Sequence, residues 1–175
     1  MSFVEDAALN LQVVYTRISQ FLGHEAMLLD ENRLREWLGL LDPQLIYEIP
    51  IRLADEREGK NAFPKDVYRV RDDLAMIRTR IERIETGEAW AETPPTRTVR
   101  LVGSIAVERG DQPDVYRANS AILVFRQRAQ DEVADMIPAR RRDLIRILPE
   151  HCTLLRRTVV FGETILKTPN LGIFF

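Results

Sequence analysis

The sequence is poor in the residues that hold metals and form disulfides. It has one cysteine, Cys152, and two histidines, His24 and His151, in 175 residues. A single cysteine excludes a disulfide within the chain and fits a reducing cytoplasm. These three residues form no Cys-x-x-Cys pair and no His-x-x-x-His pair, which are common spacings of metal ligands. We therefore expect no iron–sulfur cluster and no transition-metal site in this chain.

Long apolar runs and an excess of one charge are also missing. No stretch approaches the roughly 20 apolar residues that a membrane helix needs, and the first ten residues carry acids rather than the basic region of a secretory signal. The 25 basic and 27 acidic residues give a net charge of −2, which does not favour binding to nucleic acid. The composition is that of a cytoplasmic globular protein, and residues 1–175 suffice for one domain with a substantial core.

The first half of the chain favours helices. Residues 2–22 repeat apolar side chains at helical spacing behind a capping-box pattern at Ser2 and Glu5. The helix formers after Gly23 could extend this helix to residue 29. We expect one long amphipathic helix at the start of the chain.

Two further helices are predicted from their start and stop signals. Asp30 is a candidate N-cap for a short helix that ends before Pro43, because a proline disfavours helix at the residue before it. Another helix begins at Asp72 or Asp73 and ends near Gly87, a residue type common just after helices. Its apolar stripe consists of Leu74, Ile77, Ile81 and Ile84.

The remaining segments alternate apolar and polar side chains, as strands do. Residues 44–54 form one such segment, and Pro50 places it at an edge or bends it, because proline cannot donate to a ladder. Four long strands then follow one another, with Gly103 and Pro138 expected to help the sheet bend. They cover residues 99–107, 115–128, 133–148 and 154–161, the last two joined as a hairpin at 149–151.

Helices followed by a run of strands indicate the α+β class with a mostly antiparallel sheet. Since the strands are long, we expect strong bending of the sheet, with the helices packed into its concave face to make a cone. The chain ends on an apolar segment, residues 170–175, which includes Phe174 and Phe175. Burial of each such side chain contributes roughly 1.5–3 kcal/mol, so we expect this segment to be held on the body or in an assembled complex.

Several short motifs in register resemble the small (β) subunit of aromatic-ring-hydroxylating dioxygenases, the terminal oxygenases of Rieske non-haem iron systems. The matching residues are His24-Glu25-Ala26-x-Leu28-Leu29-Asp30, Trp37-Leu38-x-Leu40, Tyr47-x-Ile49-Pro50-x-Arg52, Arg117-x-Asn119 with Phe125-Arg126-x-Arg128, Arg140-x-Arg142-Asp143-x-x-Arg146, Arg156-Arg157-Thr158-Val159 and Asn170-Leu171-x-Ile173-Phe174-Phe175. The chain departs from the family at Gly23, where an aromatic is common, and at Phe161-Gly162, where a Leu-Asp pair is usual.

The resemblance implies the cone-shaped fold of ketosteroid isomerase and scytalone dehydratase, the cystatin-like type. It also implies a non-catalytic, structural chain in an oxidoreductase of commonly three α and three β subunits. In such complexes the larger α subunit carries the Rieske two-iron two-sulfur cluster and a mononuclear Fe(II), and dihydroxylates an aromatic compound. Electrons come from NAD(P)H through a reductase and often a ferredoxin. We therefore expect no catalytic, cofactor-binding or metal-binding residue in this chain.

The expected functional residues are thus subunit contacts. In an extended strand Arg140 and Arg142 share one face, while Asp143 lies on the other face with Arg141. This charged segment is either a solvated strand with internal ion pairs or a stripe that meets acids on a partner chain. The further interface candidates are Trp90, Phe174 and Phe175.

An alternative function is a free-standing isomerase, dehydratase or ligand-binding protein of the cone fold for a hydrophobic small molecule. It needs a general base inside the cone. Tyr47 and Tyr116 could supply a phenol, and His24 a base, although a hydrogen-bonded helix histidine explains His24 as well. Glu25 and Asp30 do not share a helix face, and the adjacent His151 and Cys152 lack an orienting third group. The sequence places no base convincingly.

Overall fold

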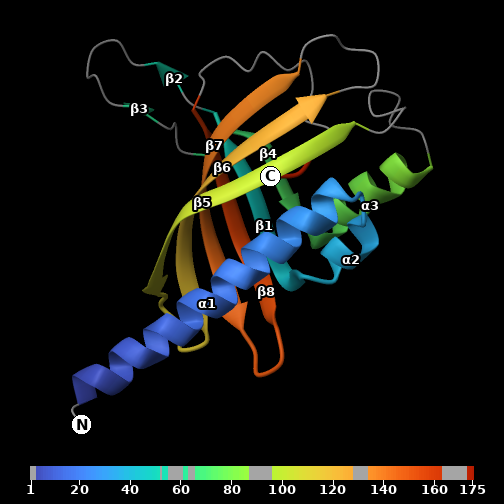
Figure 1. The fold of residues 1–175 in the computed structure, drawn as a ribbon. Coiled ribbons are helices and arrows are strands. Elements are labelled where there is room, and N and C mark those ends of the chain that lie inside the picture. The colour runs from blue at the N-terminus through green and yellow to red at the C-terminus, as the bar shows by residue number, and fades with distance from the viewer. Residues whose placement is uncertain are drawn as a thin grey trace.

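A long helix, α1 (Phe3–Asp30), opens the fold and crosses one face of the sheet obliquely (Figure 1). The computed structural model describes residues 3–51, 53–54, 61–62, 66–86, 96–127, 134–162 and 173–175. The predicted extension of this helix is confirmed, because α1 continues through Gly23 to Asp30. A Cβ atom at Gly23 would meet nothing within 4 Å, so the glycine marks neither a turn nor a close contact.

The second helix, α2 (Leu34–Leu38), is a single short turn whose N-cap is Arg33. The prediction that Asp30 caps this helix is wrong. Asp30 ends α1, and its carboxylate accepts hydrogen bonds from the Thr98 hydroxyl at 2.9 Å and from the Arg100 main-chain nitrogen at 2.8 Å. The Asp30 carboxylate therefore binds a distant strand instead of capping α2, as the local sequence had predicted.

The third helix, α3 (Leu74–Glu85), begins as predicted. The Asp73 carboxylate accepts a hydrogen bond of 2.8 Å from the Met76 main-chain nitrogen, which satisfies one of the free donors of the first turn. Ile77 and Ile81 are buried, and Leu74 and Ile84 pack partly against the core.

Six strands form one sheet in the order β4-β1-β8-β7-β6-β5. They are β1 (Leu41–Pro50), β4 (Tyr68–Asp73), β5 (Arg97–Arg109), β6 (Val115–Gln127), β7 (Asp135–Ile147) and β8 (Cys152–Phe161). Only the β1–β8 pair of this sheet is parallel. The predicted β7–β8 hairpin is confirmed and lies at the centre of the sheet, and the mixed α+β class is confirmed with it.

Local sequence did not predict three strands. β4 pairs with β1, and the two-residue strands β2 (Leu53–Ala54) and β3 (Asn61–Ala62) pair with each other. Leu53 and Ala54, predicted at the end of the strand over residues 44–54, thus form a separate short strand. β2 and β3 have only two residues each, and four of the six residues of β4 are charged, so pairing with a neighbouring strand rather than their own sequence pattern defines these strands.

The bends of the sheet lie partly where proline and glycine predicted them. The β5–β6 register shifts between Gly103 and Ala106, where Ser104 has a φ of 49°. The β1–β4 register shifts at Pro50, so this proline bends an inner strand. Pro138 does not break β7, because it sits in an uninterrupted register with β6 and its carbonyl accepts from the Gly162 nitrogen at 3.0 Å.

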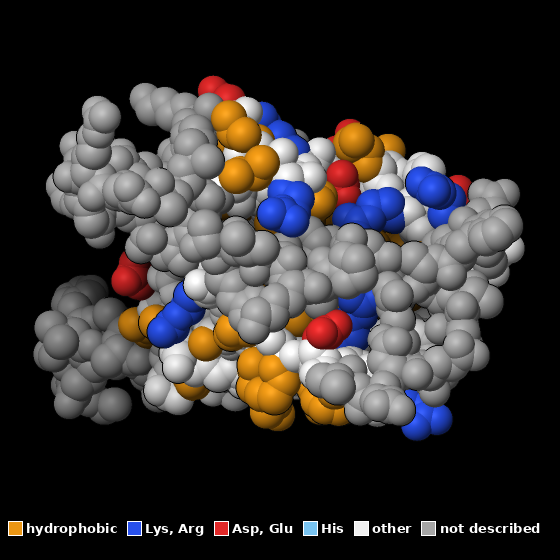
Figure 2. Space-filling model, turned by 90° about the horizontal axis from the view of Figure 1, so that it is seen from above, with side chains coloured by type: hydrophobic (Ala, Val, Ile, Leu, Met, Phe, Trp, Pro, Cys, Tyr) orange, Lys and Arg blue, Asp and Glu red, His pale blue; other side chains and the backbone are white. Residues whose placement is uncertain are grey.

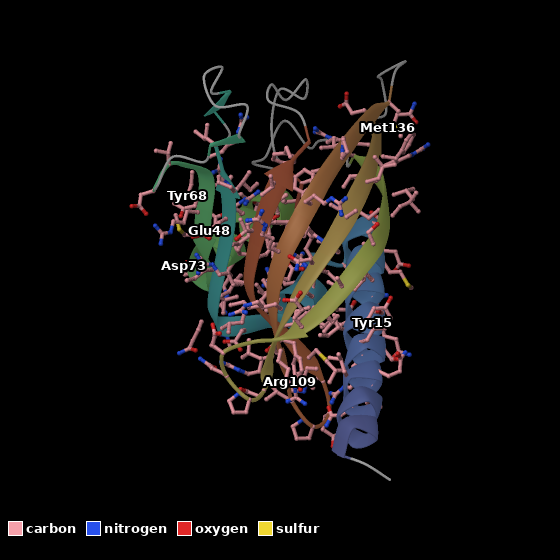
Figure 3. The ribbon with its side chains drawn as sticks, turned by 90° about the vertical axis from the view of Figure 1, so that its left-hand side faces the viewer. Tyr15, Glu48, Tyr68, Asp73, Arg109 and Met136 are labelled. Atoms are coloured by element: carbon pink, nitrogen blue, oxygen red, sulfur yellow. The ribbon has the colours of Figure 1, made fainter. Side chains whose placement is uncertain are left out.

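The sheet has an inner face covered by the helices and an outer face toward solvent. Alternation along β6 and β7 sends Ile122, Val124 and Ile145 inward to meet α1 residues such as Ile18 and Leu22. In Figure 3, α1, which carries the labelled Tyr15, runs along one side of the bent sheet. Within the described residues, no helix is both long and apolar enough to cross a membrane.

Candidate functional site

A cluster of four charged side chains occupies the inside of the cone. Glu25 of α1 faces Arg157 of β8, whose Nη1 and Nη2 donate to the two Glu25 oxygens at 2.7 and 2.8 Å. Arg157 also donates from Nε and Nη2 to the Asp143 carboxylate at 2.9 and 2.8 Å. Arg141 Nη1 donates to Glu25 at 3.2 Å, and all four side chains are buried. We refer to Glu25, Arg141, Asp143 and Arg157 as the inner ion cluster.

The elements place this cluster for simple geometric reasons. Arg141 and Asp143 are two residues apart on β7, so both point to the inner face. Asp143 is the register partner of Arg157 on β8. Glu25 lies on the same buried helix stripe as Leu22, three residues before it.

The charged groups of the inner ion cluster shift one another's pKa values. Burial alone would raise the pKa of Glu25, but the Arg157 and Arg141 charges and hydrogen bonds outweigh it, so the pKa is lowered. Burial would likewise lower the pKa of Arg157, but Asp143 and Glu25 hold it well above its usual value. The pKa of Arg141 is lowered, first by burial and then by the Arg157 charge. Two carboxylates therefore balance two guanidinium groups, and Glu25 is a paired anion rather than a poised proton acceptor.

The last two residues fill the space beside this cluster. The Phe174 ring lies 4.5 Å from the Trp37 ring and edge-on to Tyr47, and the Arg80 guanidinium lies 4.5 Å from its centre. Phe175 packs edge-on against Phe161 at 5.0 Å. Both terminal rings are buried, as a filled core requires.

Main-chain hydrogen bonds fix the Phe174–Phe175 segment in place. Arg100 donates from Nε and Nη2 to the Phe174 oxygen at 3.2 and 2.7 Å, and its Nη1 pairs with Asp30. Arg157 donates to the Phe175 oxygen at 2.7 Å, and the Phe175 nitrogen donates to the Tyr47 hydroxyl at 3.0 Å. Burial raises the pKa of Tyr47, so the phenol stays neutral. The Tyr47 phenol and the Glu25 carboxylate are thus both occupied within the chain.

The structure separates the predicted interface residues. Arg140 and Arg142 lie exposed on the outer face, as the alternation predicted. The side chains of Asp143, Phe174 and Phe175 are buried in this chain's own interior. Asp143 lies on the face of β7 opposite to Arg140, as predicted, and its carboxylate accepts from Arg157. Trp90 lies outside the described residues.

The sequence reasoning missed Glu25 and Arg157 as an inner pair. A carboxylate within an otherwise apolar helix stripe was the available signal for Glu25. For Arg157 the signal was its position in the alternation of β8, which places it on the same face as the buried Val159. Neither signal names the partner, because the contact spans 132 positions of the chain.

The two histidines and the cysteine line a separate surface hollow of about 270 Å³. His24 and His151 are exposed, Cys152 is buried, and burial raises the pKa of its thiol, which disfavours the reactive thiolate. Arg17, which also lines the hollow, donates to the main-chain oxygens of Leu148 and His151 and so ties α1 to the β7–β8 turn. Among the described residues, no three His, Cys, Asp or Glu side chains gather closely enough to hold a metal ion.

The fold matches solved structures over nearly its full length. A naphthalene 1,2-dioxygenase structure with bound indole aligns with a TM-score of 0.83 and 20% identity, covering 100% of this chain and 95% of that chain. An NTF2-like protein with a cystatin-like fold from Novosphingobium aromaticivorans aligns with a TM-score of 0.60 and 14% identity, covering 93% and 92%. These similarities confirm the cone-shaped, cystatin-like fold.

Sequence comparison then defines the family. Residues 24–168 match the model of the ring-hydroxylating beta subunit. The beta subunit of an N,N-dimethyl phenylurea N-demethylase from Sphingobium sp. (strain YBL2) is 40% identical over 159 residues, which are 89% of this chain and 88% of that protein. The chain belongs to the ring-hydroxylating beta subunit family. It is therefore the small, structural subunit of an aromatic-ring-hydroxylating oxygenase, an oxidoreductase, as the motifs predicted.

Proposed function

We propose that this chain is the cytoplasmic scaffold of an oxygenase whose larger α subunit holds all the iron. The Rieske two-iron two-sulfur cluster and the mononuclear Fe(II) belong, in this proposal, to the α subunit, with three α and three β chains in the complex. A reductase, with or without a ferredoxin, delivers electrons from NAD(P)H to the α subunit. This chain, folded as one domain over residues 1–175, contributes rigidity and subunit contacts.

The observation that carries this proposal is the filled interior of the cone. In an isomerase or dehydratase of this fold the cone must admit a ligand to a general base. Here the Phe174 and Phe175 rings occupy the interior, and the Glu25 and Asp143 carboxylates are both bound by Arg157. This arrangement supports a structural role over the alternative of a free-standing isomerase, dehydratase or ligand-binding protein.

The reaction of the complex has two candidates. The family description and the resemblance support dihydroxylation of an aromatic ring. The 40% identical relative is named for N-demethylation of N,N-dimethyl phenylureas, which supports oxidative removal of an N-methyl group from an aryl urea. Both reactions use an arene-bearing substrate, and in this proposal the α subunit decides between them.

Co-expression tests the scaffold role. We expect the α subunit to be soluble and active only when this chain is present, and the native mass of the complex to fit equal numbers of the two chains. An α subunit that is fully active alone, beside a monomeric small chain, would contradict the proposal.

Assays of the reconstituted complex then separate the two reactions. With reductase, NADH and O₂, release of formaldehyde from an N,N-dimethyl phenylurea identifies the demethylase. A cis-dihydrodiol from naphthalene or benzoate identifies the dioxygenase. Turnover of a hydrophobic ketone by this chain alone, without NADH, would instead favour the isomerase.

A further inference from the structure

The outer face of the sheet carries a band of exposed apolar side chains across its longest strands. Val99 of β5 is 54% exposed, Leu101 of β5 63%, Phe125 of β6 39% and Met136 of β7 59%. Large apolar side chains at this exposure are ordinary when they are scattered, but a contiguous group marks a binding surface.

The strand register makes these side chains contiguous. Val99 is paired with Phe125, and Phe125 with Met136, so the three form one row across three strands. The next row of outward-facing side chains on the same three strands contains Leu101, Leu123 and Pro138. Directly paired side chains on one face lie about 4.5–5.5 Å apart at Cβ, and diagonal neighbours in adjacent rows about 7–8 Å, within reach of aromatic and long side chains. Figure 3 places Met136 near one end of β7.

A shallow groove follows this band. Its volume is about 520 Å³, and its walls include Leu101, Leu123 and Pro138 on one side and the small residues Gly103 and Ala121 on the other. Gly103 and Ala121 are register partners, so two small residues side by side make the depression. The groove thus follows from the row of small side chains and crosses the strands rather than running along them.

One arginine lines the groove, and a second lies one row beyond it. Arg140 is paired in register with Ala121 and lines the groove, and Arg142 is paired with Asn119 one row further along. Both are exposed, and within the described part of the chain neither guanidinium has a carboxylate or carbonyl partner. Arg141, between them, points inward to Glu25. We name the surface formed by Val99, Leu101, Phe125, Met136, Arg140 and Arg142 the outer-face patch.

The charge of this patch selects the partner. Apolar anchors flanked by arginines are typical of the energetically important part of protein interfaces. Among the described outer-face residues that β5, β6 and β7 contribute to the rows of the patch, none is acidic. Further along the Arg142 row lies Glu48 of β1, which is buried and accepts from Arg156, so it does not change the exposed charge of the patch. A second copy placed face to face would therefore set arginines against arginines. The partner must bring an apolar surface with carboxylates at its border. In Figure 2, the view from above, hydrophobic, basic and acidic side chains lie interspersed on the visible described surface.

We infer that the outer-face patch is the surface on which the large subunit of the oxygenase docks, with carboxylates of that subunit meeting Arg140 and Arg142. This inference rests on the proposed function, since it takes the large subunit as the partner. It narrows the interface candidates to residues that the fold leaves exposed. It also gives the two faces of β7 different roles. The inward side chains make contacts within the chain, and the outward side chains bind the partner.

Matched variants test the patch. M136E and the double variant R140E/R142E should each raise the dissociation constant of the small-subunit–large-subunit complex by about tenfold or more, since truncation or reversal of central contacts has effects of this size. M27E is the control for M136E, because Met27 on α1 is 55% exposed. R78E/R83E on the exposed side of α3 is the control for the arginines. Both controls should bind within twofold of the unaltered chain.

Footprinting of Met136 gives an independent measurement. Oxidation of Met136 by hydroxyl radicals should slow severalfold on addition of the large subunit, while that of Met27 should not change. Unaltered binding by M136E and R140E/R142E, or an unprotected Met136 in the intact complex, would overturn the inference and leave the scaffold role standing. Protection of Met136 in this chain alone at high concentration would assign the patch to a second copy. Failure of the unaltered chain to bind the large subunit would overturn both the inference and the proposed function.

Discussion

At the scale of single residues, the inner ion cluster places four full charges where water is excluded. Such a cluster contributes little net stability compared with apolar side chains of the same shape, but it becomes costly when one member is removed. Arg157 is its centre, because it binds Glu25, Asp143 and the Phe175 oxygen together. The cluster therefore fixes one arrangement of α1, β7, β8 and the last residues.

Glu25→Gln tests the cluster directly. The substitution leaves Arg141 and Arg157 with only one buried anion, so we expect the free energy of unfolding to fall by about 3 kcal/mol or more. Urea denaturation followed by circular dichroism measures it. Glu85→Gln is the matched control, because the Glu85 pair with Arg35 lies at the surface and should contribute about 1 kcal/mol or less. Equal losses for the two variants would show that burial does not matter here.

The pH dependence of stability follows from the lowered pKa of Glu25. A carboxyl group with a lower pKa in the folded chain contributes stability above its ordinary value of 4.5 and loses it as the pH falls through the folded value. As the pH decreases below about 4.5, we expect the unfolding midpoint of the unaltered chain to decrease more steeply than that of the Glu25→Gln variant. Parallel profiles for the two proteins between pH 7 and pH 3 would contradict this assignment.

Phe175→Ala tests whether the last residue belongs to the core of this chain. Removal of a buried aromatic ring leaves a cavity, and we expect a loss of about 3–5 kcal/mol. Phe125→Ala, which removes a ring 39% exposed on the outer face, should cost about 1 kcal/mol or less in the isolated chain. A small loss for Phe175→Ala would mean that a partner, rather than this chain, holds the ring.

At the scale of elements, we expect alanine substitutions at Gly23 and Gly110 to have opposite effects on stability. Gly23 lies within α1 with open space around it, so Gly23→Ala should stabilise the chain by about 0.5–1 kcal/mol. At Gly110, in the β5–β6 turn, a Cβ atom would lie 2.6 Å from the Val115 carbonyl oxygen, so Gly110→Ala should destabilise it. Thermal unfolding of the two variants measures both signs, and a loss of stability for Gly23→Ala would show that α1 needs a glycine there.

The elements with strong periodicity could be predicted from the sequence, and the others could not. Alternation identified β5 to β8 and the two faces of β7, and the Asp73 cap located the start of α3. Asp30 and Asp143 show where this reasoning ends. Each has a plausible local role, but its partner comes from a distant segment: Arg100 for Asp30, and Arg157 of the neighbouring strand for Asp143. Sequence pattern gives the direction of a side chain, whereas its partner depends on the register of the whole sheet.

At the scale of the whole molecule, the described residues pack the interior of the cone. Here Phe174, Phe175 and the inner ion cluster close it, and the uncovered surface is the outer face. A chain built in this way can support an enzyme without performing its chemistry. Its packed inner face holds the strands in place, and the strands in turn position the side chains of the outer face.

A last prediction concerns metal removal. A metal bound to the folded state raises the free energy of unfolding by an amount that grows with the logarithm of its concentration relative to its Kd, so its removal lowers the unfolding midpoint. We expect bipyridyl with dithionite, followed by desalting, to leave the unfolding midpoint of the isolated chain unchanged, while the same treatment abolishes the visible absorbance and the activity of the complex with the large subunit. Zinc-free and iron-free buffers serve as the control. A lower midpoint that ferrous iron restores in the isolated chain would assign it a metal site and contradict the division of labour between the two subunits.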